Sequence, residues 1–400
     1  MQKTIFGLWF QPKNVLNFFV ALVICVSLFS CSHKDEKKTA TGTIKLSKTS
    51  FVAMEGWNSD DFAQTISVFS RNCDKILQNK KTYLADSAVK IKTIDYQKVC
   101  KKFASKNITS SAQMKKFLEE EFTPYVVSAN NNPIGKFTSY YEATVHASLE
   151  KDSRYKYPIY GKPNDLIEIN LRDFDANLPN TRLVGHVIGN KFVPYYKRAE
   201  IENNGVNAPV LMWGDDPVDI HFMQIQGSAI AKMADGSELR IGYADNNGHK
   251  FKGIGSIMLE KKLLKSGEMS MENIREWLRK HPKEAEELMQ QNDRFIFQRI
   301  SDADGPLGAF GIPLTAGRSM AVDNYLIPLG AILWLDTGDP DKKPIEKLMF
   351  AQDIGAAIKG AVRGDYFWGH GDEALHFAGR MNSAGKYYLL APKYSAPKVD

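Results

Sequence analysis

The sequence predicts a mainly β protein with peripheral helices, and three observations support this prediction. Apolar residues recur at three- and four-residue steps between residues 59 and 124, as in amphipathic helices. Short β-like runs separated by turn signals follow from 137 to about 255, and strand-and-turn segments resume from 292. The chain has 400 residues, 43% hydrophobic and 24% charged. This ordinary globular composition is long enough for two or three domains.

The N-terminus is similar to an export signal that ends in a lipidation site. Lys3 and Lys13 precede the apolar run 18–29, which suits a signal-peptide core and is too short to span a bilayer. The run ends in LFSC, which resembles a bacterial lipobox whose cysteine, Cys31, is lipidated and becomes the new N-terminus. We therefore expect a lipoprotein signal peptide over 1–30. The alternative is a plain secretory signal with a chance cysteine.

The residues after Cys31 predict where the protein is held. Ser32 stands where an aspartate tends to retain Gram-negative lipoproteins at the inner membrane, so we expect the periplasmic face of the outer membrane. One acyl chain binds only marginally, so stable anchoring fits a multiply acylated cysteine. The polar, charge-rich stretch 31–50 predicts a tether from the membrane to the folded body.

Three helices are predicted between residues 59 and 124. Ser59 is a plausible N-cap for the first helix. The apolar stripes consist of Phe62, Ile66, Phe69, Cys73 and Ile76, then Tyr96, Val99, Cys100 and Phe103, then Met114, Phe117 and Leu118. Cys73 and Cys100 both lie on apolar faces. They are either a disulfide between packed helices, which an oxidising periplasm permits, or two buried thiols.

The segment from 137 to about 255 is β-rich and predicts a small barrel. Its runs are KFTSYYEATV, DLIEINL, RLVGHVIGNKFVPYY, PVLMWG, DIHFMQIQGSAIAKM and LRIGYA. Helices return at 256–291, where Ser270 can cap one helix and His281-Pro282 ends it. From 292 on, further strands are predicted at RFIFQRI, SMAVD, AILWL, KLMFAQ and KYYLLAP.

Composition and missing motifs exclude several classes of function. The net charge is +6 without a dense Lys/Arg block, so no nucleic-acid partner is expected. There is no G-x-S-x-G nucleophile elbow and no Walker phosphate loop. Cys73 and Cys100 alone cannot form a zinc site, and we expect no metal and no cofactor. The chemistry that remains is carboxylates and aromatic rings, which carbohydrate-active enzymes use.

Residues 351–371, AQDIGAAIKGAVRGDYFWGHG, combine two aspartates with small residues. A strand-like run ends at Asp353, residues 355–360 form a tight turn or a single helical turn, and Asp365 opens a second run. Asp323 ends another strand-like run. Glycine permits the backbone geometry that such crossings need. The three acids are either a shared site or ordinary turn and cap aspartates.

Several long motifs resemble the membrane-bound lytic transglycosylase A family and its three-aspartate domain. They are FTSYYEAT (137–144), HFMQIQGSA (221–229), YADNNGHKFKGIGSIML (243–259), GPLGAFGIPLTAGRSMAVDNYLIPLG (305–330), LMFAQDIGAAIKGAVRGDYFWGHGDEA (348–374) and AGRMNSAGKYYLLAPK (378–393). The resemblance implies a double-psi β-barrel domain, formed with the N-terminal helices by 51–135 and 293–400. It implies a smaller β-barrel substrate domain inserted at 136–292, with a glycan groove between the two.

The resemblance also implies an activity. The family cuts the β-1,4 bond between N-acetylmuramic acid and N-acetylglucosamine in peptidoglycan without water, leaving a 1,6-anhydromuramic end. Its catalytic acid maps to Asp365, and the companion aspartates map to Asp353 and Asp323. One acid that later acts as base suffices here, whereas hydrolysis needs two carboxylates. We further expect the charge of Asp353 to raise the pKa of Asp365.

Family groove residues map to Thr138, Tyr140, Gln226 and Ser228, and Lys359 is a candidate for orienting a carboxylate or a muramyl group. The alternatives are a tyrosine in the barrel core, a turn after Gln226 and a solvated lysine. The expected partners are peptidoglycan glycan strands, the membrane through a lipid anchor at Cys31, and other wall-remodelling proteins. The alternative functions are a non-catalytic peptidoglycan-binding module and a hydrolytic muramidase.

Two positions depart from the family pattern. Ile354 replaces a small hydroxyl residue, so we expect a hydrogen bond near Asp353 to be missing. Ala143 replaces a proline, which we expect to be a loop adjustment. No role is assigned to His249 or His370, which are expected to be structural or exposed.

Overall fold

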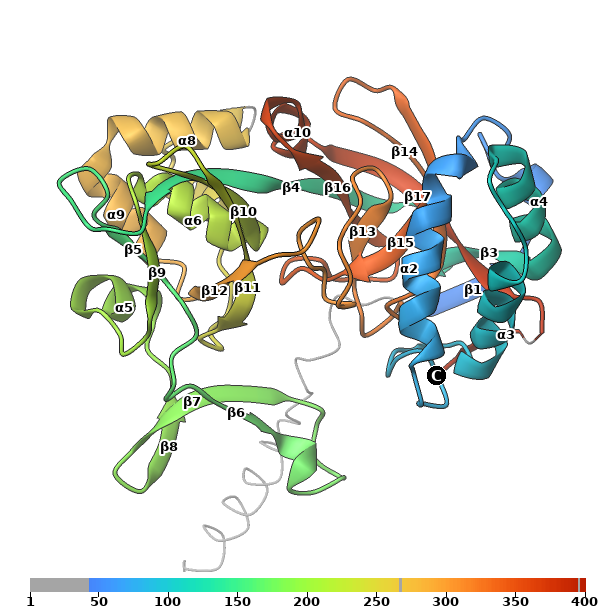
Figure 1. The fold of residues 1–400 in the computed structure, drawn as a ribbon, viewed down its shortest axis with the longest axis horizontal. Coiled ribbons are helices and arrows are strands. Elements are labelled where there is room, and N and C mark those ends of the chain that lie inside the picture. The colour runs from blue at the N-terminus through green and yellow to red at the C-terminus, as the bar shows by residue number, and fades with distance from the viewer. Residues whose placement is uncertain (1–42, 266–267, 395) are drawn as a thin grey trace, which may run out of the picture. The chain divides into compact units, whose positions relative to one another are not determined.

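The computed structural model describes residues 43–265, 268–394 and 396–400. The predicted signal peptide, Cys31 and most of the tether lie outside the described residues. Within the described ranges, no helix is both long and apolar enough to cross a membrane. The strands there form a 13-stranded sheet, a three-stranded sheet and a two-stranded pair (Figure 1). The predicted mainly β class is confirmed, whereas the double-psi topology stays a prediction.

The first part of the described chain is mostly helical. Its elements are β1 (Ile44–Lys48), η1 (Phe51–Ala53), η2 (Phe62–Thr65), α2 (Ile66–Leu77), β2 (Val89–Lys90), α3 (Thr93–Ala104) and α4 (Ser111–Glu121). The three predicted helices are confirmed. The predicted cap is wrong, because Asp61 accepts from the amide of Ala63, while Ser59 lies in the preceding turn. Cys73 of α2 and Cys100 of α3 form a disulfide, which decides between the two alternatives.

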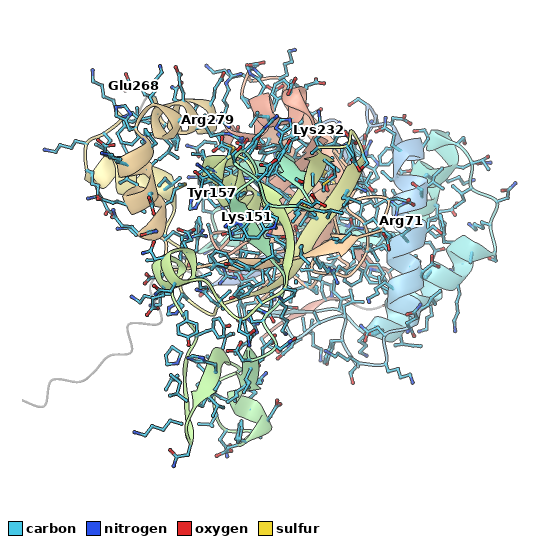
Figure 2. The ribbon with its side chains drawn as sticks, turned by 60° about the vertical axis from the view of Figure 1, so that its left-hand side comes forward. Arg71, Lys151, Tyr157, Lys232, Glu268 and Arg279 are labelled. Atoms are coloured by element: carbon cyan, nitrogen blue, oxygen red, sulfur yellow. A yellow bond between two sulfur atoms is a disulfide. The ribbon has the colours of Figure 1, made fainter. Side chains whose placement is uncertain are left out.

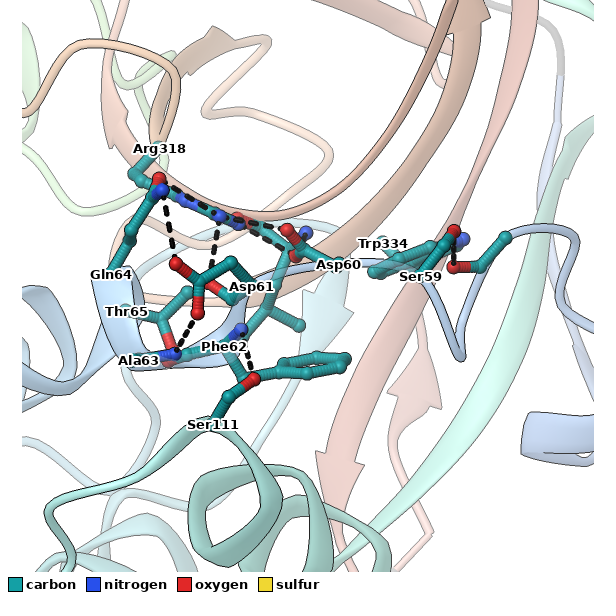
Figure 3. Close-up of polar contacts among 12 residues, drawn as sticks. Ser59, Asp60, Asp61, Phe62, Ala63, Gln64, Thr65, Ser111, Arg318 and Trp334 are labelled. Carbon is teal, nitrogen blue, oxygen red and sulfur yellow. Dashed lines mark hydrogen bonds and ion pairs between the residues drawn. The ribbon is translucent and has the colours of Figure 1, made fainter.

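A buried ion pair joins this helical segment to the strands. The guanidinium of Arg318, which is 2% exposed, donates to both carboxylate oxygens of Asp60 at 2.6 and 2.7 Å (Figure 3). Asp60 also accepts from the amide of Leu348 in β15 (Pro344–Asp353) at 2.9 Å. Because a buried charge is costly unless paired and hydrogen-bonded, these groups hold the segments together. The helices are thereby anchored beside the strand that carries Asp353.

The C-terminal strands except the last, together with one earlier strand, form one part of the large sheet. The elements are β3 (Phe122–Ala129), β13 (Ser319–Val322), β14 (Ile332–Gly338), β16 (Arg363–His370), α10 (Asp372–Ala378), β17 (Asn382–Pro392) and β18 (Lys398–Val399). The order along the sheet is β1-β3-β17-β14-β15-β13-β16-β4-β10-β11-β12. The strands predicted from 292 on are confirmed, and α10 was not predicted. Buried Trp334, Leu335 and Phe350 lie in the core beneath these strands.

Strand β4 (Gly135–Ser148) belongs to both parts of the sheet. Its first half pairs in parallel with β16 and antiparallel with β17. Its second half pairs with β10 and β9. The chain returns through β12 (Ile296–Ser301), which pairs with β11. The insert predicted over 136–292 begins within β4 and ends before β12, and these boundaries stay a prediction.

The inserted segment mixes strands and helices. Its elements are β5 (Tyr157–Tyr160), β6 (Ile167–Asn170), η3 (Leu171–Asp173), β7 (Arg182–Ile188), β8 (Lys191–Pro194), α5 (Arg198–Asn204), β9 (Val210–Gly214), α6 (Pro217–Gln226), β10 (Ser228–Met233), β11 (Glu238–Asn246), α7 (Ile254–Glu260), α8 (Met271–Lys280) and α9 (Pro282–Gln290). Residues 219–233 were predicted as one strand. This prediction is wrong for the first half of the run, which belongs to α6. Asp216 caps α6, Pro217 opens it, and Gly227 ends it at a φ of 89°. These end signals outweigh the β-like composition.

Charged contacts fix the outer elements of the insert. Ser270 caps α8 as predicted. Arg279 of α8, which Figure 2 labels, donates to Asp216 at the start of α6 at 2.8 Å. The ammonium of Lys151 lies 4.8 Å from the ring centre of Trp213 in β9, the strand that pairs with β5. The helices and strands of the insert therefore share one packed body.

Candidate active site

Strand β13 places two of the aspartates on either side of one residue. Ala321 of β13 pairs with Asp353 at the end of β15 and with Asp365 in β16. Gly364 permits this arrangement, since a Cβ there would lie 2.5 Å from the sulfur of Met320. The two carboxylates therefore come from strands that flank the same position, as their shared glycine-rich segment suggested.

Asp365 is half-buried and contacts a hydroxyl that is itself held by a cation. Thr138 of β4 donates to the Asp365 carboxylate, and Arg363 donates to the Thr138 hydroxyl at 2.7 Å. Burial raises the pKa of Asp365, while the Thr138 hydrogen bond and the Arg363 charge work against that rise. A raised pKa favours the protonated carboxyl, which is the form that a general acid needs.

Asp353 has a different set of partners. The hydroxyl of Tyr140 donates to one carboxylate oxygen at 2.9 Å, and the amide of Ala309 donates to the other at 3.0 Å. Burial raises the pKa of Asp353 to about 6, with a smaller contribution from the charge of Asp365. We expected the like-charge effect to act on Asp365. Burial accounts for the raised pKa of Asp365, and the like-charge effect falls on Asp353.

Asp323 organises a turn. It is 2% exposed, and its carboxylate accepts from the amides of Gly360 at 2.9 Å and Tyr325 at 3.2 Å. Gly360 has a φ of 117°, which favours glycine, and it closes the predicted turn. Lys359 lies 3.9 Å from Asp323 and 5.2 Å from the Tyr325 ring centre. Asp323 therefore holds the loop that follows Asp353.

A groove of about 810 Å³ runs from Asp353 into the insert. Of the predicted site residues, it is lined by Tyr140, Gln226, Ser228, Asp353 and Lys359. Thr138, Asp365 and Asp323 are not among its lining residues. Gln226 also accepts from the amide of Tyr141 at 3.2 Å, which ties the end of α6 to β4. Tyr140 connects the groove with the acids, because its phenol bonds Asp353. Burial raises the Tyr140 pKa, with smaller contributions from the charges of Asp353 and Asp365.

The two departures from the family pattern, Ile354 and Ala143, lie in different surroundings. Ile354 is 44% exposed and lines the groove, and its own backbone amide bonds the Asp353 carboxylate. Ala143 is buried within β4 and pairs with Ala229 of β10, so the expected loop adjustment is wrong. His249 bonds the carbonyl of Tyr195 at 2.7 Å, which is a structural contact.

Sequence reasoning missed Arg363 and a charged cluster whose residues Glu168, Arg182 and Asp245 line the groove. In that cluster Arg182 of β7 bonds both Glu168 and Asp245, and Lys162 lies 2.6 Å from Asp245. Arg182 is the main cause of the low pKa of Glu168, about 2. These residues come from separate segments, so no local motif marks them. Arg363 stands two positions before Asp365, which was a usable signal.

Comparisons with known proteins cover most of the chain. Residues 136–299 match the MltA specific insert domain, and residues 318–391 match the 3D domain. The Escherichia coli K12 protein "Membrane-bound lytic murein transglycosylase A" is 31% identical over 280 residues, which are 68% of this chain and 69% of that protein.

Solved structures agree with this match. The crystal structure of MltA from Neisseria gonorrhoeae is 34% identical, covers 90% of this chain and 96% of its own, and has a TM-score of 0.77. The structure of E. coli MltA with bound chitohexaose, 23% identical, covers 88% and 95% with a TM-score of 0.61, and it bears on the fold alone. The resemblance predicted from the motifs is thus confirmed, and the chain belongs to the membrane-bound lytic murein transglycosylase A family.

Proposed function

We propose that this protein is a lytic transglycosylase that cleaves the β-1,4 bond between N-acetylmuramic acid and N-acetylglucosamine in peptidoglycan. Family membership and the groove beside Asp353 support the substrate class. The observation that carries the proposal is Asp365, a carboxyl with a raised pKa that bonds Thr138 on the neighbouring strand. Asp353 and Asp365 differ in their partners, so the reaction is assigned to one acid.

In this proposal Asp365 acts first as acid and then as base. Its proton passes to the glycosidic oxygen as the bond from that oxygen to C1 of the muramic acid breaks. The 6-hydroxyl of the same sugar then attacks C1, and its proton returns to the Asp365 carboxylate. The product is a 1,6-anhydro ring, and no water is consumed. Attack within one sugar is favoured over attack by water because the hydroxyl is already close to C1.

Thr138 and Arg363 adjust the acidity of Asp365 for both steps. Burial alone favours the neutral acid, which is the form needed for the first proton transfer. The hydroxyl of Thr138 and the positive charge of Arg363 stabilise the carboxylate that exists after that transfer. These opposing effects favour the protonated and the ionised form of Asp365 in turn, and acid–base catalysis uses both forms.

Asp353, Tyr140 and Asp323 are positioning residues in this scheme. Asp353 holds the Tyr140 hydroxyl and the loop at Ala309, both of which line the groove. Gln226, Ser228 and Lys359 offer hydrogen-bonding groups for sugar hydroxyls and acetamides in the same groove. Asp323 supports the turn that carries Lys359.

We also propose that Cys31 is lipidated and holds the protein at the periplasmic face of the outer membrane. The lipobox-like LFSC sequence and Ser32 support this location. Relatives carry the words "membrane-bound" in their names. The proposed partners outside the membrane are the glycan strands of the wall and other wall-remodelling proteins.

Product analysis of digested sacculi tests the function. Mass spectrometry should detect anhydro-muropeptides from the wild-type protein, and their rate of release should fall at least about 10²-fold in Asp365→Asn. Asp372→Asn, at an exposed aspartate that opens α10, is the matched control and should leave the products unchanged. New reducing ends would indicate a muramidase, and binding without products would indicate a binding module. Either result would overturn the proposal.

A further inference from the structure

The three-stranded sheet β6–β8 has one face built only from apolar residues. Directly paired residues of a sheet point to the same side, and alternate residues of a strand do so too. Ile167 pairs with Gly185, Ile169 with Leu183, Gly185 with Pro194, and Val187 with Phe192. We call these side chains the apolar face: Ile167, Ile169, Leu183, Gly185, Val187, Phe192 and Pro194.

The opposite face of the same sheet packs against the rest of the insert and lines the groove. Val184 and His186 are 8% and 4% exposed, and the His186 ring packs 5.2 Å from the ring of Tyr195. Glu168 and Arg182 point the same way as Val184 by the register, and both line the groove. The sheet thus turns its polar and packed side toward the site.

The apolar face, by contrast, is exposed. Leu183, Val187 and Phe192 are 40%, 54% and 37% exposed. An antiparallel sheet with one face on the core normally presents polar residues on the other face. Four of the 21 exposed large apolar side chains of the described chain lie together on this face, so they form a patch: Ile167, Leu183, Val187 and Phe192. A patch of this kind marks an interaction surface. Figure 1 shows the sheet standing out from the neighbouring strands.

The chemistry of the apolar face favours one of three possible binding partners: a glycan strand, a second copy of the chain or a lipid surface. A glycan strand needs hydrogen-bonding groups, and these side chains have none. A second copy of the chain is disfavoured because a stable interface buries about 800 Å² on each partner, more than six half-exposed side chains provide. A lipid surface needs only apolar contact. Acidic and basic residues between 167 and 194 balance: Glu168, Asp173 and Asp175 against Arg172, Arg182 and Lys191.

A series of contacts links this sheet to the start of the described chain. Arg172 of η3 lies 3.6 Å from Asp86, just before β2. Strand β2 pairs with β18, and β18 contacts β1, which begins at Ile44. Only eleven residues lie between the proposed lipidated Cys31 and Thr43, and the twelve steps along the chain reach about 40 Å. The tether therefore keeps the start of the folded body, to which these contacts link the sheet, close to the bilayer.

We propose that the apolar face of β6–β8 lies on a phospholipid surface, as a second membrane contact beside the lipid anchor. Two membrane signals hold a protein more firmly than one. Because the opposite face lines the groove, this contact turns the groove away from the bilayer. The proposal uses the proposed anchor at Cys31 but does not depend on the transglycosylase activity.

An environment-sensitive dye on the apolar face tests the proposal. Val187→Cys carries the label in the full-length lipidated protein, since Cys73 and Cys100 are paired in a disulfide. Leu149→Cys, 65% exposed beyond β4, is the matched control. On phosphatidylcholine vesicles we expect a blue-shifted emission, at least threefold quenching by brominated lipid at position 187, and neither effect at position 149. Adding Phe192→Asp should remove both effects at 187.

Three outcomes separate the alternatives. Flotation of both labelled proteins with the vesicles reports the anchor independently of the dye. Flotation with an unshifted dye at position 187 would overturn the proposal. A shift that disappears when each vesicle holds one copy would show that a second copy covers the face. Because the segment has no net charge, quenching should persist in 1 M salt, and a loss in salt would also contradict apolar insertion.

Discussion

Asp353 and Asp365 flank the same residue, Ala321, yet their surroundings differ in one respect. Asp365 has a cation within its network, because Arg363 bonds the hydroxyl that bonds the carboxylate. Asp353 has only neutral donors, the phenol of Tyr140 and backbone amides. Burial raises both pKa values, but only Asp365 has a charge that stabilises its ionised form.

This difference shows why two carboxylates in one sheet need not share a reaction. A group that gives and regains a proton must have both forms stabilised, and a cation stabilises the ionised form. A group that only positions its neighbours needs donors in fixed directions. Asp365 fits the first description and Asp353 fits the second.

The largest expected effect separates the two acids by activity. Asp365→Asn should lower kcat/KM on labelled sacculi by about 10²- to 10⁴-fold, the usual contribution of a general acid. Asp353→Asn should lower it by about tenfold, since it loses a positioning contact. Equal losses in the two variants would mean that both carboxylates react, as in a muramidase.

The second effect concerns the cation. Arg363→Met removes the positive charge that lowers the pKa of Asp365, so that pKa should rise. The acid then stays protonated to higher pH, and the alkaline limb of the kcat/KM profile should move up by about one pH unit. Arg363→Lys should keep the limb near its wild-type position. If Arg363→Met lowers activity without moving the limb, its role is structural.

A smaller effect concerns stability and Asp353. Its folded pKa of about 6 lies above the ordinary value of 3.8, so the folded state binds this proton more tightly. The free energy of unfolding should therefore decrease, by about 2 kcal/mol, as the pH rises from 4 to 6. Urea denaturation of Asp353→Asn should lack this decrease, while Asp372→Asn should retain it. If the free energy of unfolding of Asp353→Asn decreased with pH as steeply as that of the wild type, this would contradict the raised pKa of Asp353.

The smallest effect concerns the departure at position 354. Ile354→Thr restores a hydroxyl beside Asp353, and an added donor should lower the Asp353 pKa by less than one unit. Since Asp353 already accepts from Tyr140 and Ala309, activity should change by less than about threefold. The denaturation profile used for Asp353→Asn measures the shift. A large gain in activity would show that the missing hydroxyl limits this protein.

Local sequence signals predicted most elements. They failed where the capping residues of a helix or the pairing of a strand determines the structure. The strand at Leu348–Asp353 and the helix stripe through Phe69 and Cys73 follow from periodicity. Residues 219–226 carry the same apolar composition as a strand, and the capping groups at their ends made them a helix. Ala143 looked like a loop position because its place inside a 14-residue strand depends on pairing with Ala229.

The sequence alone determined the family, the mainly β class and the identity of the aspartates, because long motifs and periodicity are properties of contiguous residues. Tertiary structure decided the rest of the site. The disulfide, the Thr138–Arg363 contact to Asp365 and the charged cluster at Asp245 join residues that are far apart in the chain. The apolar face likewise required the strand register, since only pairing shows which side chains share a side. Burial set the two pKa values, and burial is a property of the packed molecule.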